Sequence, residues 1–179
     1  MLTLVSAAVF AQVPVTSFMG VSVDGSEKDM VATFMEKGFE FFPEERTLYG
    51  KCNGTDVSIQ MEINANTNKI YSLYVCERVL MDEVGIRKRF NQLVGRFQQD
   101  GSYKAMADYS IPAEVKIGDE LRKGGDRLKA VFYQVGDKKL STGTVDMDVL
   151  QKYAVHFAIN GYGGKYYIEM NFYNGYNFP

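Results

Sequence analysis

The chain has 179 residues, of which 46% are hydrophobic and 23% are charged. A chain of this size can bury one sizeable core and is short for two ordinary domains, so we expect one domain. The formal net charge of -2 excludes the basic excess that is typical of nucleic-acid-binding proteins. We therefore expect no nucleic-acid partner.

The first residues predict export. Residues 1–11 form an apolar run that ends with Val9 and Ala11, the spacing that a signal peptidase reads. The run is about half of the roughly 20 residues that a bilayer-spanning helix needs. No Lys or Arg precedes it, so an upstream start or a fortuitous apolar end is the alternative. We expect a signal peptide over 1–11 and a periplasmic or extracellular domain over 12–179, with no transmembrane segment.

A helix is predicted between Ser26 and Gly38. Ser26 and Asp29 have the spacing of a capping box, and the glycine ends the helix. Phe39 directly follows this glycine and is expected to contact Phe34. The apolar stripe of this helix must be buried, and we expect it to pack on one face of the sheet.

Residues 47–75 predict a three-stranded antiparallel meander. Asn53-Gly54 is the dipeptide that best tolerates the positive φ angles of a type I′ turn. The following run alternates apolar and polar residues from Val57 to Ile63, and residues 64–68 supply a second turn. A strand rich in Tyr, Val and Leu completes the meander.

The two cysteines, Cys52 and Cys76, fall on the first and third strands of this meander. With a strand between them their Cα atoms lie about 9 to 10 Å apart, whereas a disulfide needs less than about 7 Å. We expect two free thiols, and a disulfide remains the alternative that export favours. A single histidine gives no Cys-His set for zinc or for a cysteine nucleophile, so we expect no metal and no cofactor.

The second half begins with the strongest helical pattern, over residues 82–99. We interpret its basic residues, Arg87, Lys88, Arg89 and Arg96, as a solvated face rather than an anion-binding patch. Residues 115–122 and 127–135 are predicted to form a hairpin around the loop 123–126. The polar stretch 136–148 is interpreted as surface turns, because its Asp146-x-Asp148 pair lacks the rest of a calcium loop.

The last hairpin is predicted from its alternation. A loop over residues 161–164 sets Asn160 opposite Lys165 and His156 beside Glu169. The apolar residues of both strands then share one face. Tyr167 and Tyr173 fall on the other face.

These elements predict an α+β fold with an antiparallel sheet, formed by the meander and C-terminal hairpins. Two main helices pack on one face, and the order of a helix followed by strands occurs twice. Residues 18–30, 37–39 and 130–134 resemble uncharacterised exported proteins of Bacteroides-type bacteria. The layout is also similar, at the level of the fold, to β-lactamase-inhibitor-like and PepSY-like periplasmic modules. That resemblance implies a module that binds proteins or restrains proteases.

Three classes of function are open: a binding or interaction module, an envelope structural component, and a hydrolase. Binding is favoured because folding signals run through the chain without a catalytic signature, and the partner is a protein, a peptide or a glycan. We predict no catalytic residue and no metal ligand. The candidate binding residues are Tyr162, Tyr167, Tyr173, Tyr176, His156 and Glu169. We expect the aromatic residues to gather at one end of the hairpin, either covered by a neighbouring segment or exposed to a partner.

Overall fold

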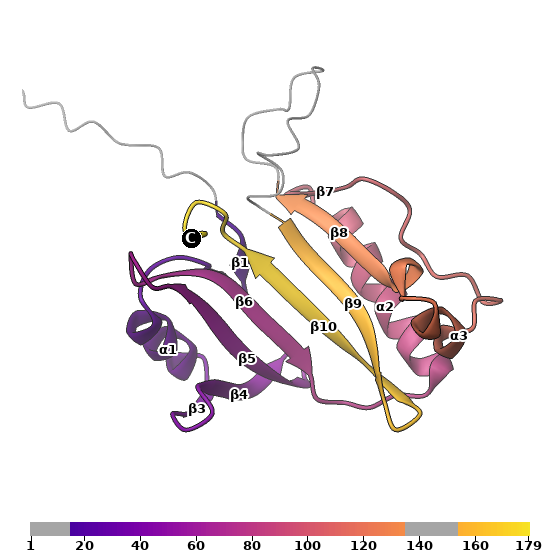
Figure 1. The fold of residues 1–179 in the computed structure, drawn as a ribbon, viewed down its shortest axis with the longest axis horizontal. Helices are drawn as coiled ribbons and strands as arrows, with labels where there is room; N and C mark the ends of the chain where they lie inside the picture. The colour runs from indigo at the N-terminus through magenta and orange to yellow at the C-terminus, as the bar shows by residue number, and fades with distance from the viewer. Residues whose placement is uncertain (1–14, 135–153) are drawn as a thin grey trace, which may run out of the picture.

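The computed structural model describes residues 15–134 and 154–179. These residues form an eight-stranded antiparallel sheet, a helical layer, and a separate two-stranded sheet (Figure 1). The predicted signal peptide and the stretch 136–148 lie outside the described residues. None of the described helices combines the length and the apolar character needed to cross a membrane.

The elements follow one another in two series. The first series comprises β1 (Ser17–Phe18), β2 (Val21–Ser22), α1 (Glu27–Glu36), β3 (Glu40–Phe42), β4 (Thr47–Cys52), β5 (Thr55–Asn64) and β6 (Lys69–Glu77). The second comprises α2 (Glu83–Gln99), β7 (Tyr103–Ala105), α3 (Ile117–Arg122), the 3-10 helix η1 (Asp126–Leu128), β8 (Lys129–Gln134), β9 (Ala154–Tyr162) and β10 (Lys165–Tyr173). The predicted α+β class is confirmed.

The two series meet in the middle of the large sheet. Its strand order is β3-β4-β5-β6-β10-β9-β8-β7, so the last strand of each series pairs with the other. Leu73 of β6 lies opposite Phe172 of β10, and Val75 lies opposite Met170. Each half is therefore a helix followed by four strands, counted from the edge of the sheet to its centre.

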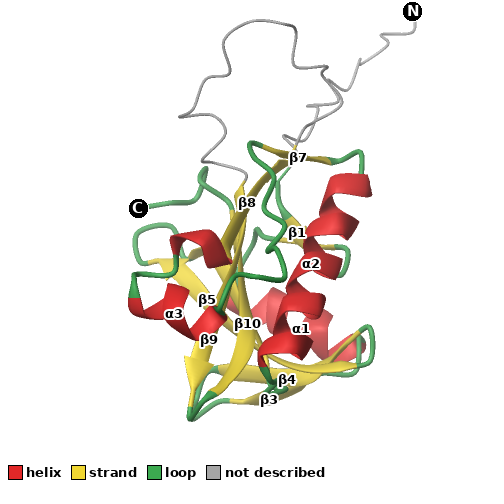
Figure 2. Ribbon diagram, turned by 90° about the vertical axis from the view of Figure 1, so that its right-hand side faces the viewer, coloured by secondary structure: helices red, strands yellow, loops and turns green. Residues whose placement is uncertain are grey.

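The core lies between the sheet and helices α1 and α2 (Figure 2). One row of paired core residues crosses seven strands and consists of Phe41, Leu48, Ile59, Val75, Met170, Phe157 and Ala130. Helix α1 contributes the buried Met30 and Phe34, and α2 contributes Ile86, Phe90 and Val94. The helices thus cover a sheet face that the period-two alternation of the strands makes apolar.

The predicted signals of the first half are confirmed. The amide of Asp29 donates to Ser26 Oγ over 3.2 Å, so Ser26 caps α1. The rings of Phe34 and Phe39 lie 5.3 Å apart, as expected after the helix-ending glycine. Asn53 and Gly54 have φ angles of 50° and 81°, which fit a type I′ turn.

The hairpin predicted over residues 115–135 is wrong in its first strand. Residues Ile117–Arg122 form α3, with Ile117 and Leu121 one helical turn apart. Gly124 and Gly125 have φ angles of 106° and 70°, and the amide of Gly125 donates to Glu120 O over 2.8 Å. The two glycines therefore end a helix, where the sequence suggested that they turn a hairpin.

The register predicted for the last hairpin is wrong by two residues, but its faces are right. Lys165 lies opposite Tyr162, and His156 lies opposite Asn171, not opposite Glu169. The turn needs only Gly163 and Gly164, whose φ angles of 57° and 75° make it a two-residue turn. A shift of two residues preserves the face of every side chain, because the side-chain period of a strand is two.

Both cysteines are free, as expected. Strand β5 separates the two strands that carry them. Cys52 packs against the core, whereas Cys76 lies in register with Ser58 and Glu169 on the opposite face.

The close packing of Phe39 on Gly50 gives a stability prediction. A Cβ added at Gly50 lies 2.5 Å from the ring of Phe39, which is buried. We expect Gly50→Ala to lower the free energy of unfolding by about 1–3 kcal/mol through overpacking. Gly95→Ala in α2 is the control, because its Cβ meets nothing within 4 Å and helix propensity favours Ala by about 1 kcal/mol. Equal unfolding midpoints in urea for the two variants contradict this packing.

Candidate functional site

One face of the large sheet is turned away from α1 and α2, and we call it the open face. Two rows of paired residues cross it. The first row is Thr47, Gln60, Tyr74, Asn171, His156 and Val131; the second is Tyr49, Ser58, Cys76, Glu169, Ala158 and Lys129. Thr47 alone among these residues is buried. The open face is therefore accessible along these two rows, whereas Ser72, Tyr133 and Ala154 on the same face are buried.

Glu169 is the hub of a hydrogen-bonded cluster at the centre of the open face. Asn160 donates a side-chain hydrogen bond to its carboxylate. The hydroxyls of Tyr74 and Tyr167 also hydrogen-bond to Glu169, and burial together with this carboxylate raises the pKa of both tyrosines. A carboxylate whose lone pairs accept from neighbouring donors holds those donors in place. Glu169 thus fixes two tyrosine side chains on the face.

Residues of β6, β9 and the end of β10 lie at the edge of this cluster. Ser72 Oγ donates to Asn171 Oδ1 over 2.7 Å, across the seam between β6 and β10. The ring centres of His156 and Tyr173 lie 5.2 Å apart in an edge-on arrangement. Burial lowers the pKa of His156, although part of its side chain is exposed.

The predicted binding residues are brought together only in part. Tyr167, Tyr173, His156 and Glu169 share the open face, as their alternation indicated. The expectation that the aromatic residues gather at one end is wrong. Tyr162 lies beside the first residue of β10, at the hairpin tip, whereas Tyr176 follows the end of β10.

The C-terminal tail is held at the far end of the sheet from the hairpin tip (Figure 1). Asn174 Nδ2 donates to Val23 O over 2.7 Å, and Asn177 Nδ2 donates to Ile70 O over 2.8 Å. Both asparagines are buried. The polar composition of the tail hid these anchors from sequence reasoning, because their acceptors are backbone groups more than 100 residues away.

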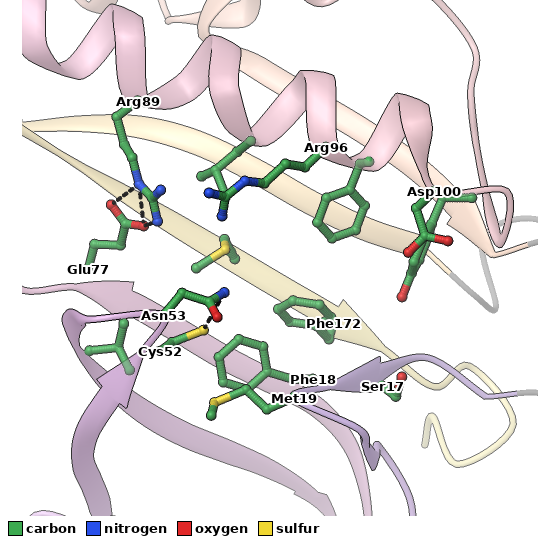
Figure 3. Close-up of a pocket in the computed structure, with 15 residues that line it drawn as sticks. Ser17, Phe18, Met19, Cys52, Asn53, Glu77, Arg89, Arg96, Asp100 and Phe172 are labelled. Carbon is green, nitrogen blue, oxygen red and sulfur yellow. Dashed lines mark hydrogen bonds and ion pairs between the residues drawn. The ribbon is translucent and has the colours of Figure 1, made fainter.

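A pocket of about 480 Å³ lies on the helical side of the sheet, and we call it the α2 pocket (Figure 3). Its apolar lining comprises Phe18, Val57, Leu93, Phe97, Met170 and Phe172. Its polar lining includes Asn53, Glu77, Arg89, Arg96 and Asp100. Helix α2 forms one wall, and β1 with the turn between β4 and β5 forms the other.

A buried ion pair closes one end of this pocket. Glu77 is 1% exposed, and both of its carboxylate oxygens accept from Arg89, with Arg89 Nη2 2.5 Å from Glu77 Oε1. Arg96 also lines the pocket, and no ion pair or hydrogen bond joins its side chain to another described residue. Burial is the main cause that raises the pKa of Cys52, and the positive charge of Arg89 nearby opposes it.

The interpretation of the basic residues of α2 as one solvated face is wrong for two of them. Arg89 is held by Glu77, and Arg87 donates to Glu83 and to the backbone carbonyl of Val115. Lys88 and Arg96 are exposed. The partner of Arg89 lies on β6, and one acceptor of Arg87 is the carbonyl of Val115, so contacts beyond the helix distinguish these two residues from Lys88 and Arg96.

Comparison of the chain with models of known protein families, with curated proteins and with solved structures finds no match. The resemblance to exported Bacteroides-type proteins therefore stays a prediction from the residues that carry it. Within residues 15–134 and 154–179, no three His, Cys, Asp or Glu side chains gather as a metal site.

The buried ion pair gives a second prediction. We expect Arg89→Met to lower the free energy of unfolding by about 3 kcal/mol, because it leaves the carboxylate of Glu77 buried without its partner. Arg96→Met, on the same helix and without a partner to lose, should change it by less than about 0.5 kcal/mol. Equal losses in guanidinium unfolding would show that the ion pair does not hold Glu77. Adding Glu77→Leu to Arg89→Met should recover most of the loss.

The environment of His156 gives a third prediction. Its folded pKa lies below the unfolded value of 6.5, so the folded chain binds fewer protons between the two values. The free energy of unfolding should therefore fall as the pH is lowered from above 6.5 through the folded pKa. His156 is the only histidine, so its imidazole resonance in NMR reports this pKa directly. His156→Gln should remove the contribution of this residue to the pH dependence of the free energy of unfolding. A measured pKa at or above 6.5 would contradict the prediction.

Proposed function

We propose that the chain is an exported binding module that captures a protein partner on the open face of its sheet. The observation that carries the proposal is the set of tyrosines fixed around Glu169. Tyr side chains combine apolar area with a hydroxyl, and they are enriched where proteins bind one another. Export is supported by the signals in residues 1–11.

The arrangement of the tyrosines favours binding over hydrolysis. Glu169 accepts hydrogen bonds from Asn160, Tyr74 and Tyr167, so its oxygens are engaged in holding side chains. A surface whose side chains are already ordered loses less conformational entropy when it binds. The cluster is therefore suited to recognition by a fixed surface.

The breadth of the open face favours a protein over a small glycan. The two rows cross six strands, which at the usual spacing between strands is about 24 Å. A typical protein interface covers about 800 Å² on each partner. Nine-residue strands such as β9 and β10 supply a length of about 30 Å in the other direction. The open face is therefore close in size to such an interface.

Site-specific photo-cross-linking tests where the partner binds. A photoreactive residue is placed at Gln60, which is exposed on the open face, and in a second chain at Lys88, which is exposed on α2. In the producing cells we expect one defined cross-linked protein from position 60 and none of that species from position 88. Capture of the same protein from position 88 alone would overturn the proposal, as would a lack of any protein adduct at position 60.

Alanine substitutions then test how much the side chains of the open face contribute to the affinity for the partner. With the cross-linked partner purified, Tyr167→Ala and Tyr173→Ala should each weaken affinity at least about tenfold, because a few aromatic residues carry most of the binding energy of an interface. Both side chains are only half-buried, so the free energy of unfolding should fall by less than about 2 kcal/mol. Met35→Ala, at an exposed apolar position on α1, is the control and should leave affinity unchanged. Unchanged affinity in both tyrosine variants would end the case for this face.

A further inference from the structure

The α2 pocket lies on the other side of the sheet from the open face and does not take part in the proposed capture of a protein. Its volume of about 480 Å³ falls in the range of about 300–1,000 Å³ that is usual for small-molecule sites. It combines an apolar floor with an arginine that has no partner among the described residues. We propose that it binds a single acyl chain that ends in a carboxylate, such as a fatty acid.

The floor and walls provide the apolar part of the site. Met170 and Phe172 of β10 form the floor, and Phe18 packs beside them with its ring centre 5.1 Å from that of Phe172. Leu93 and Phe97 of α2 line the pocket from the helical side. Phe18, Leu93, Met170 and Phe172 already belong to the buried core, and Phe97 packs against it, so these side chains are ordered before a ligand arrives. Burial of methylene groups against them gives about 0.8 kcal/mol for each group.

The charged part of the site lies at the end formed by Arg89, Arg96 and Asn53 (Figure 3). The charge of Arg89 is offset by Glu77, which leaves the guanidinium of Arg96 as the positive group available to an anion. A carboxylate is matched by the planar fork of a guanidinium, which donates two parallel hydrogen bonds. Asn53 is exposed on the opposite wall; its Nδ2 donates to Cys52 Sγ over 3.8 Å and has a second N–H for an anion.

The position of Asp100 sets the direction of the chain. Asp100 lies at the end of the pocket remote from Glu77 and Arg89 (Figure 3), where its carboxylate repels an anion. The carboxylate of the ligand therefore lies near Arg96 and Asn53. The acyl chain extends over Phe18 and Phe172.

Titration calorimetry with dodecanoate below its micelle concentration tests the site. We expect Arg96→Gln to weaken dodecanoate binding at least about tenfold, because a charge-assisted pair is lost. Lys88→Gln is the matched control on the same helix, and it should leave the affinity unchanged. Dodecanol, which lacks the carboxylate, should bind the unmodified chain and Arg96→Gln equally. Arg96→Lys should recover part of the dodecanoate affinity.

The two free cysteines locate the ligand in the same experiment. Cys52 lines the α2 pocket, and Cys76 lies on the open face. Dodecanoate should slow the alkylation of Cys52 by a small thiol reagent at mildly alkaline pH and leave Cys76 unaffected, as read by peptide mass. The proposal is overturned if dodecanoate does not bind, if Arg96→Gln binds it as well as Lys88→Gln does, or if Cys76 alone is protected.

Discussion

The pairing of β6 with β10 is the constraint on which the rest of the structure depends. Each series of elements ends in one of these strands, and every row of core side chains crosses the seam between them. The seam joins segments 99 residues apart, as the contact between Ser72 and Asn171 shows. Because side chains alternate along a strand, the register of this one pair decides which face of both halves becomes core.

The ion pair between Glu77 and Arg89 reinforces the same seam from the helical side. Glu77 ends β6 in the first half, and Arg89 lies on the helix that opens the second half. A buried carboxylate with a bidentate partner allows little freedom in the position of α2, because the hydrogen-bond fork is planar. That position in turn defines the wall of the α2 pocket. The pocket is therefore a product of how the halves meet.

Local signals predicted most of the elements, because their causes lie within a few residues. The Ser26 cap, the Asn53-Gly54 turn and the alternation of β5 each depend on neighbouring residues only. The hairpin over 115–135 failed because a glycine pair serves equally as a helix end or a turn, and only the contacts of Ile117 with the core decide between them. The predicted register of the last hairpin was wrong because four residues, 161–164, were assigned to a turn that Gly163 and Gly164 form alone.

The sequence predicted which strand faces form the candidate site, but it did not predict all of the residues that lie there. Alternation placed Tyr167, Tyr173 and Glu169 on the outer face of the last hairpin. Tyr74 joins them from β6, and no local pattern indicates that β6 lies beside β10. The role of Arg89 was hidden for the same reason, since its partner lies twelve residues earlier on another element. Long-range pairing, rather than weak propensity, therefore limits what the sequence reveals.

The two outermost strands have a consequence for how copies of the molecule meet. β3 and β7 have three residues each, while the central strands have up to ten. A short edge strand presents few unpaired backbone N–H and C=O groups, so a second sheet gains little by adding to it. The sheet is thus protected against growth into filaments through its edges. Crowding of many copies should therefore favour contacts between side-chain surfaces over pairing of backbone groups at the sheet edges.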